Sequence, residues 1–357
     1  MSSLSSNENR RKTARNKLFF TTFASMMVAN DRRPNLILMN DLYTSEFLNR
    51  DYTSILRGLC MIAIVFSHTA NEFSALLAEY HIAGLLICGR LATGIFFFLS
   101  GYGLTLSIQR NSIDRSYVVR HLRHLLLPYL IFWIFYIVVG LLTRTLPTDI
   151  SFYTAFFFLR MPYVDAWFFK TIIGIYIVYF FLARFVKARA GICISIIIIV
   201  YAMLLSTTDV SSFWWNTIMC FPLGILCANH IDHFKRKVSW KAIIFLLCLA
   251  IAFYKLSFPV FLGEAFPPLA ISLFCAFLSM KLKTAPGKTV IAFIGQNSLY
   301  MYLMEEIPID FISSAQTGFL VYVVGGIIMT ILLSYTGKKT ETLIMRICTP
   351  RSGQQNS

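Results

Sequence analysis

The sequence predicts an all-α integral membrane protein, a bundle of about ten transmembrane helices with both termini cytoplasmic. Three observations support this fold class. Of the 357 residues, 57% are hydrophobic and only 14% are charged, and the mean hydropathy of +0.66 is well above that of an ordinary soluble domain. Apolar runs recur along the chain, many of them close to the roughly 20 residues that a helix needs to cross a bilayer. The basic residues gather in alternate segments between these runs.

The expected transmembrane helices begin near residue 53 and follow one another with short connections. They cover residues 53–70, 88–108, 124–142, 164–183, 191–205, 211–229, 240–256, 264–281, 289–306 and 318–336. The chain is thereby divided into a basic tail over 1–50, a membrane domain over 51–336 and a short cytoplasmic tail over 337–357. Two interpretations of the first tail stay open. It is either a flexible cytoplasmic segment, in which Met39 is an alternative start, or a targeting segment, because LFFTTFASMMVA is typical of a signal peptide.

The positions of lysine and arginine orient the bundle. Of the 32 such residues, 26 lie in alternate segments beginning with the N-terminal tail, 3 lie in the intervening segments, and 3 lie inside apolar runs. Basic residues concentrate on the cytoplasmic side of membrane proteins, so both termini are expected there. The net charge of +15 is then explained by topology, and no nucleic-acid partner is expected. The eight cysteines have no metal or redox spacing, and the histidines form no matched ligand cluster, so no metal site is expected.

The first expected helix carries two ionisable residues that are costly to place in lipid. Arg57 and His68 are 11 residues apart, which is about 20° beyond three full helical turns, so both side chains face the same way, ~16 Å apart along the axis. Ionisable residues within a span usually face a cavity and indicate a functional site. The structural alternatives are snorkelling for Arg57 and an interhelical hydrogen bond for His68. Glu72, four residues after His68, either orients the imidazole or is an acid of the outer loop.

Two further stretches combine small or basic residues near the second and third expected helices. The run GIFFFLSGYGLTLS (94–107) carries Ser100, Gly101 and Gly103, which permit either close helix packing or a local break in the backbone. Arg120 and Arg123 are three residues apart, on one helical face near the expected cytoplasmic surface. They either clamp phosphates or simply follow the distribution of basic residues on that side.

Six motifs follow one another in a fixed order along the chain. They are Arg57 and His68 with ten residues between them, FFFLSGY (96–102), Arg120-x-x-Arg123 before LLLPYL, AWFF (166–169), FPLGILC (221–227) and IGQNSLYMYL (294–303). In order and spacing they resemble the acyltransferase 3 family of multipass membrane acyltransferases, over about residues 50–336. One position departs from the family, which often has a histidine where this chain has Glu305.

The resemblance implies transfer of an acyl group, usually acetyl from acetyl-CoA, to a carbohydrate hydroxyl at the bacterial cell surface, by a multipass protein of the cytoplasmic membrane. It implies that His68 is catalytic, either as a general base or as an acyl carrier, and Glu72 is a candidate partner. Acetyl-CoA is expected as a donor substrate, with no bound cofactor. Its candidate contacts are Arg57, Ser100, Arg120 and Arg123.

The implied acceptor is a polysaccharide or a lipid-linked glycan. Its candidate contacts are Arg90, Trp167, Lys170, Tyr302 and Glu305. Aromatic rings stack on sugars, but interfacial aromatic belts are the commoner explanation, and Arg90 and Lys170 either hold an anionic group or snorkel outward. The alternative function is a multipass transporter or flippase of a lipid-linked sugar or small solute. A transporter often has an internal repeat, and residues 180–340 contain no second copy of the Arg57 to His68 arrangement.

Overall fold

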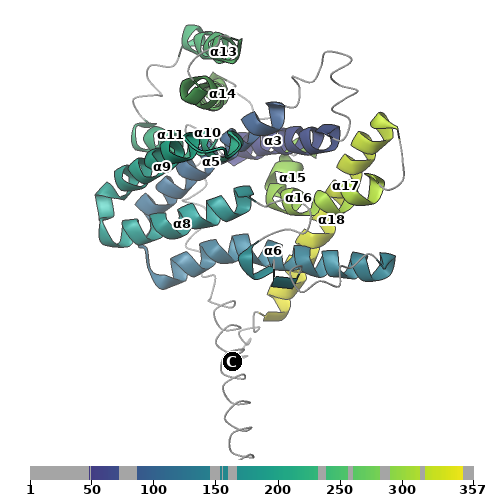
Figure 1. Ribbon diagram of the computed structural model, residues 1–357. Helices are drawn as coiled ribbons and strands as arrows, with labels where there is room; N and C mark the ends of the chain where they lie inside the picture. The colour runs from purple at the N-terminus through teal and green to yellow at the C-terminus, as the bar shows by residue number, and fades with distance from the viewer. Residues whose placement is uncertain are drawn as a thin grey trace, which may run out of the picture.

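The computed structural model describes residue 48 and residues 50–71, 87–144, 153–154, 156–159, 167–231, 239–255, 260–281, 290–313 and 318–348. Within these ranges the chain is helical and forms no strand. Most of the long helices lie in stacked layers with roughly parallel axes, and the last helix crosses them obliquely (Figure 1). Most of the predicted tails, residues 1–47 and 349–357, lies outside the described residues.

Six helices of the described chain are long and apolar enough to cross a membrane. They are α3 (Arg50–Asn71), α5 (Ile87–Arg110), α6 (Arg115–Thr143), α8 (Trp167–Phe185), α9 (Ala190–Ser206) with the preceding turn η3 (Lys187–Arg189), and α18 (Phe319–Cys348). Each overlaps one predicted range. The prediction of an all-helical membrane protein is confirmed, whereas the number of ten spans and the cytoplasmic location of the termini stay predictions.

The other four predicted ranges are also helical. Two of them overlap the single helices α13 (Trp240–Lys255) and α14 (Val260–Lys281), and the other two are interrupted. The range 211–229 is divided into α10 (Phe213–Asn216) and α11 (Cys220–Asn229). The range 289–306 is divided into α15 (Val290–Gln296) and α16 (Ser298–Met304), and α17 (Glu306–Ser313) follows; a short turn, η2 (Phe156–Phe158), precedes α8.

Local chemistry explains the break between α16 and α17. Pro308 has no backbone N–H, and its ring clashes with the carbonyl four residues earlier, which disfavours a continuous helix through Met304. The α16 helix therefore ends at Met304 with Glu305 as its C-cap, and α17 starts at Glu306. At the other end of α16, Asn297 turns its side-chain amide back to donate to the Phe293 carbonyl at 2.8 Å. Glu305 is thus placed at the junction of two helices.

Glycines allow two helix pairs to touch through their backbones. A Cβ atom at Gly58 of α3 would lie 2.0 Å from the Ile291 carbonyl oxygen, and one at Gly295 of α15 would lie 1.6 Å from the Ser54 carbonyl oxygen. In the same way, a Cβ at Gly101 of α5 would lie 2.3 Å from the Phe221 carbonyl oxygen of α11. The small residue Gly101 therefore serves close packing, one of its two predicted alternatives. The α3–α15 contact also fixes the neighbouring helix α16 close to α3.

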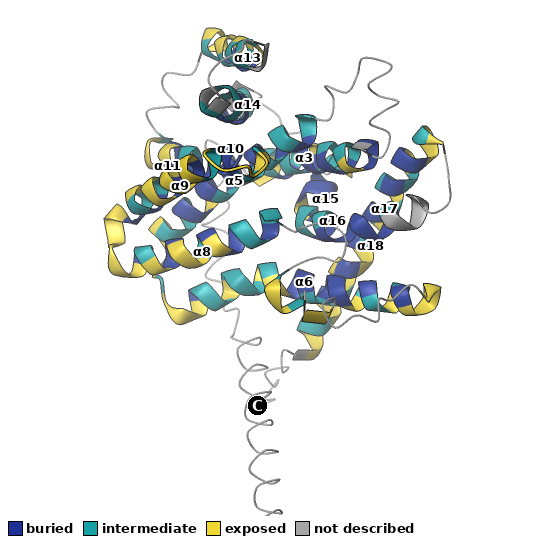
Figure 2. Cartoon of the chain, viewed as in Figure 1, coloured by how far each residue is buried: buried dark blue, intermediate teal, exposed yellow. Residues whose placement is uncertain are grey.

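The outward faces of the bundle are apolar. Exposed side chains cover much of α9 and the outer faces of α6, α8 and α18 (Figure 2). They include Leu142, Phe181, Ile196, Met203, Leu204 and Leu332. A surface of this kind is favourable against lipid and unfavourable in water, so these faces fit the hydrocarbon region of a bilayer.

Candidate functional site

One face of α3 carries both ionisable residues that the sequence analysis selected. Arg57, Met61, Ile64 and His68 recur at helical spacing, so their side chains leave the helix on the same side. The first three line a cavity of about 180 Å³. His68 follows Ile64 by one turn, and therefore lies beyond the end of that cavity.

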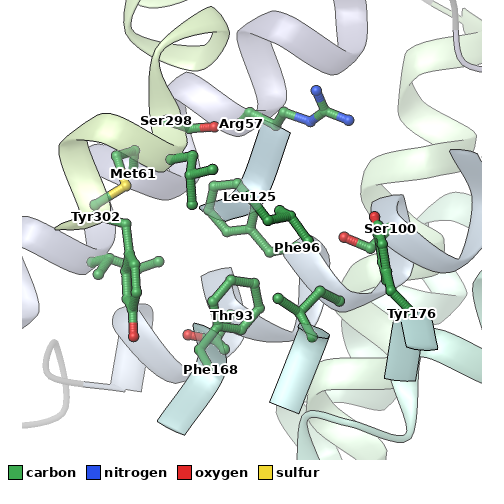
Figure 3. A pocket seen from close by; sticks show the side chains of 13 residues that line it. Arg57, Met61, Thr93, Phe96, Ser100, Leu125, Phe168, Tyr176, Ser298 and Tyr302 are labelled. Carbon is green, nitrogen blue, oxygen red and sulfur yellow. The ribbon is translucent and has the colours of Figure 1, made fainter. Parts of the chain in front are cut away.

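Four other helices close the cavity around this face of α3 (Figure 3). The α5 and α8 helices supply Phe96, Ser100, Phe168 and Tyr176, and the remaining lining residues are Thr93, Leu125, Ile172, Ser298, Leu299 and Tyr302. Most of this lining is apolar. The hydroxyls of Ser100 and Tyr176 are hydrogen bonded to each other, and Figure 3 shows the Arg57 guanidinium on their side of the cavity.

Arg57 lines the cavity without a carboxylate partner. None of the described residues gives it an ion pair or a hydrogen bond, and its nearest charged or titratable neighbours are Tyr176 and Arg50. An unpaired guanidinium in an apolar region is costly, and it is stabilised when an anion or a strong acceptor comes within reach. The cavity therefore has one end suited to a negatively charged or carbonyl-rich group.

His68 is paired with Glu305, at the junction between α16 and α17. The imidazole Nδ1 lies 3.0 Å from the Glu305 Oε1 atom. The side chain of Glu305 is only 2% exposed, whereas that of His68 is 42% exposed, so the imidazole can still be reached from one side. Because a carboxylate only accepts hydrogen bonds, this contact places the hydrogen of a neutral imidazole on Nδ1 and leaves the Nε2 lone pair available.

Both α3 and α16 line the cavity first and then, further along the helix, supply one member of the His68–Glu305 pair. Tyr302 lines the cavity and Glu305 comes three residues later, just as Ile64 lines it and His68 comes four residues later. Both steps are about one helical turn, or ~5 Å. The imidazole and its carboxylate therefore lie about one turn past the cavity, at the end opposite Arg57. The other Glu305 oxygen, Oε2, is buried and has no hydrogen-bond partner among the described residues.

The two arginines of the Arg120-x-x-Arg123 motif lie on α6 and do not line this cavity. Arg120 is exposed and Arg123 is half-buried. The α6 helix contributes Leu125 to the cavity wall. Of the four predicted donor contacts, the structure thus brings Arg57 and Ser100 together, and leaves Arg120 and Arg123 outside the cavity. Glu72, the predicted partner of His68, lies outside the described residues.

Arg90 is neutralised by an acid of another helix, Glu264 of α14. Its Nη1 atom donates to Glu264 of α14 and, at 3.3 Å, to the Ser212 hydroxyl. The Ser212 hydroxyl and the Asn216 amide also donate to the same Glu264 oxygen, at 3.1 and 3.3 Å. These contacts join α5, α10 and α14, and they leave Arg90 little free charge for a ligand. The Arg90–Glu264 ion pair joins residues 174 positions apart, so it becomes apparent only from the packing of α5 against α14.

The remaining predicted contacts meet in an aromatic cluster at the start of α8. The Trp167 ring lies 5.4 Å from that of Phe213 and 5.6 Å from that of Trp214, and the Lys170 ammonium lies 5.9 Å from the Trp214 ring. Phe168 continues the cluster into the cavity, where its ring packs edge-on to Tyr302 at 5.5 Å. Trp167, Lys170 and Tyr302 are thereby placed along one aromatic wall.

Comparison with known protein families gives a match over most of the chain. The model of the acyltransferase 3 family, described as an acyltransferase domain, matches residues 50–338. No curated protein and no solved structure matches the chain. The matched segment contains every helix that lines the cavity, as well as both members of the His68–Glu305 pair.

Proposed function

The chain belongs to the acyltransferase 3 family, and from this we propose that it transfers an acetyl group from acetyl-CoA to a hydroxyl of a cell-surface or lipid-linked polysaccharide. We place it in the bacterial cytoplasmic membrane. The observation that carries the proposal is the His68–Glu305 pair, at one end of an apolar cavity whose other end holds Arg57, which has no ion pair among the described residues. Membrane acyl transfer needs a base near a thioester, and this arrangement supplies a base beside a cavity for the donor.

In the proposed reaction, His68 acts as a general base. The acceptor hydroxyl oxygen attacks the thioester carbonyl carbon, and Nε2 of His68 removes the hydroxyl proton as the new C–O bond forms. The tetrahedral intermediate then collapses, the C–S bond breaks, and the imidazolium returns the proton to the CoA thiolate. Glu305 faces Nδ1, so its carboxylate fixes the ring orientation and stabilises the imidazolium that forms during the transfer.

A covalent variant uses the same atoms. Nε2 attacks the thioester carbonyl carbon, the C–S bond breaks, and the CoA thiolate takes up the proton that the acylated ring gives up. The acceptor hydroxyl oxygen then attacks the acyl-imidazole, the C–N bond breaks, and the hydroxyl proton returns to the imidazole. Incubation of the purified protein with acetyl-CoA in the absence of acceptor distinguishes the two routes. A mass increase of one acetyl group on the peptide that contains His68 supports the covalent route. No increase, in a preparation that transfers acetyl once acceptor is added, supports the general-base route.

The donor is proposed to enter at the Arg57 end. Its phosphates and amides provide acceptors for the guanidinium, while Phe96, Leu125 and Phe168 provide apolar walls for the pantetheine arm. Arg120 and Arg123 do not line the cavity, so we propose that they contact the donor outside it, at the expected cytoplasmic surface. The acceptor is proposed to approach His68 along the aromatic wall of Trp167, Lys170 and Tyr302. Arg90 is the weakest acceptor candidate, because Glu264 already neutralises it.

The test measures the O-acetyl content of surface polysaccharide by NMR in a deletion strain complemented with the wild-type protein, with His68→Ala or with His230→Ala at matched expression. His230 is an exposed histidine at the end of α11 and serves as the matched control. We expect acetyl groups with the wild type and the control, and none with His68→Ala. Equal acetylation in all strains, including the deletion, would exclude the proposed acceptor.

A further inference from the structure

A second cavity lies at the other end of the α5–α8 pair, separate from the one that Arg57 lines. Its volume is about 540 Å³, and it is enclosed by the C-terminal ends of α5, α8 and α11 and by the turn that leads into α9. The two cavities share no lining residue. This end of the bundle carries Arg110, Arg184 and Lys187, and it is the end expected to face the cytoplasm.

The charge of this second cavity is entirely positive. Arg184 and Lys187 line it, and its described lining contains no aspartate or glutamate. Neither cation has an ion pair among the described residues. Lys187 adopts a left-handed backbone conformation, with φ of 53°, at the start of η3. This conformation is uncommon for a residue with a side chain, and it marks the sharp turn between α8 and α9.

Amide side chains complete the rim. Gln109 of α5 donates to the Asn229 Oδ1 atom of α11 at 2.8 Å, which orients the Asn229 amide and leaves its nitrogen as a donor. Asn111 lies beside them at the end of α5. Two guanidinium or ammonium groups together with amide N–H groups present many donors and few acceptors, which is the complement of a phosphate group.

The floor of the cavity is less polar. At the bottom, Thr105 donates to the Gly101 carbonyl at 2.7 Å, so the Tyr179 hydroxyl, 3.0 Å away, donates to the Thr105 oxygen. Both hydroxyls are thus satisfied within the protein. Ile108, Ile113 and Ile192 provide the apolar walls. The volume is larger than one phosphate needs and falls in the range of small-molecule sites, so the occupant carries a further body on its phosphate.

We propose that this cavity binds a phosphate-bearing molecule, with the phosphate on Arg184 and Lys187 and the attached body on the isoleucine wall. Two sources offer this chemistry at the expected cytoplasmic surface. One is a soluble nucleotide, such as the adenosine bisphosphate part of a CoA donor. The other is the headgroup of an anionic phospholipid. The binding chemistry is the same for both, and it does not depend on acyl transfer.

The experiment measures binding by the full-length protein in detergent, with two probes. Adenosine 3′,5′-bisphosphate is titrated by isothermal calorimetry, and phosphatidylglycerol is titrated against phosphatidylcholine by native mass spectrometry. The test variant is Arg184→Gln with Lys187→Gln. Its matched control removes the same charge through Arg189→Gln and Arg346→Gln, which are exposed residues outside the cavity. Loss of a charge-assisted contact is expected to weaken binding of the true ligand class about tenfold or more.

Each outcome decides the proposal. Weaker binding of the nucleotide in the test variant alone supports the site with a soluble ligand, and weaker binding of phosphatidylglycerol alone supports it with a lipid. Equal binding of both probes by the wild type and the test variant overturns the proposal, as does the absence of binding by either probe to the wild type. If the test variant is not folded, Ala188→Trp fills the cavity without changing its charge and is expected to give the same loss. Acetylation is not measured, so failure of this proposal leaves the acyltransferase proposal unaffected.

Discussion

Replacement of Glu305 by glutamine tests the proposed division of roles most directly. The change keeps the size of the side chain and removes the charge that faces the His68 Nδ1 atom at 3.0 Å. A hydrogen bond to a charged group contributes about 1.5–3 kcal/mol, which corresponds to roughly 10- to 150-fold in rate. Because 42% of the His68 side chain is exposed, solvent screens part of this effect, and we expect the lower end, about a tenfold fall in kcat.

The assay follows the release of CoA thiol from acetyl-CoA by the purified protein with acceptor glycan, at varied acetyl-CoA concentration. The KM for acetyl-CoA is expected to stay within about twofold of the wild-type value, because Glu305 does not line the cavity that contains Arg57. Glu264→Gln is the matched control, since it makes the same change in an acid that is paired with Arg90 instead. It removes an interhelical link but leaves the imidazole contact in place.

A double-mutant cycle separates positioning from general loss of structure. If Glu305 acts through His68, then Glu305→Gln in a His68→Ala background is expected to cause no further fall in rate. The reasoning is refuted if Glu305→Gln retains a kcat within twofold of the wild type. It is also refuted if the effects of the two substitutions multiply, because then the carboxylate acts independently of the imidazole.

Three further predictions concern the proposed donor site and the fold. Arg57→Gln is expected to raise the KM for acetyl-CoA about tenfold or more, because a charged hydrogen-bonding partner is lost; an unchanged KM in the same kinetic assay would contradict the donor role. Gly295→Val is expected to lower the melting temperature of the purified protein strongly, since a Cβ there would lie 1.6 Å from the Ser54 carbonyl oxygen. Gly103→Val is the control, because a Cβ at Gly103 would have no atom within 4 Å. Similar melting temperatures for the two variants would show that α15 moves away at little cost. Asp114 caps α6 by accepting from the Tyr117 N–H at 2.7 Å, which lowers the pKa of its carboxyl below the ordinary value. The cap therefore contributes fully above the pKa of the unfolded chain and loses its contribution as the pH falls through the lowered pKa. Asp114→Ala should lower the melting temperature near neutral pH and lose this difference in acid, while Asp114→Asn, whose amide oxygen accepts at every pH, should melt like the wild type near neutral pH and above it in acid.

Helical periodicity was enough to predict part of the site. The spacing of Arg57 and His68 placed both on one face, and the structure has the residues between them, Met61 and Ile64, lining a cavity on that face. The apolar runs likewise located the six long helices, because the length of a membrane-spanning segment is set by the bilayer. These features depend on the local sequence, which is why sequence reasoning reaches them.

Contacts between distant segments could not be predicted in this way. His68 and Glu305 are separated by 237 positions, and the pairing depends on how α16 is docked against α3. From the sequence, Glu72 is the candidate partner because it lies four residues from His68, within reach along a helix. The same limit applies to Arg90, whose partner Glu264 is 174 positions away. Periodicity determines which face a side chain occupies and contains no information on which helix covers that face.

The contact of main chain with main chain at Gly58 and Gly295 restricts how the cavity lined by Arg57 can change its width. The backbones of α3 and α15 touch at these glycines, so no smaller residue can bring the two helices closer there. No change of rotamer at these positions can alter their separation. The opposite wall is different, because the rings of Phe96 and Phe168 form it. Variation in the length of the acyl group that related chains accept should therefore follow substitutions among these rings, while both glycines stay unchanged.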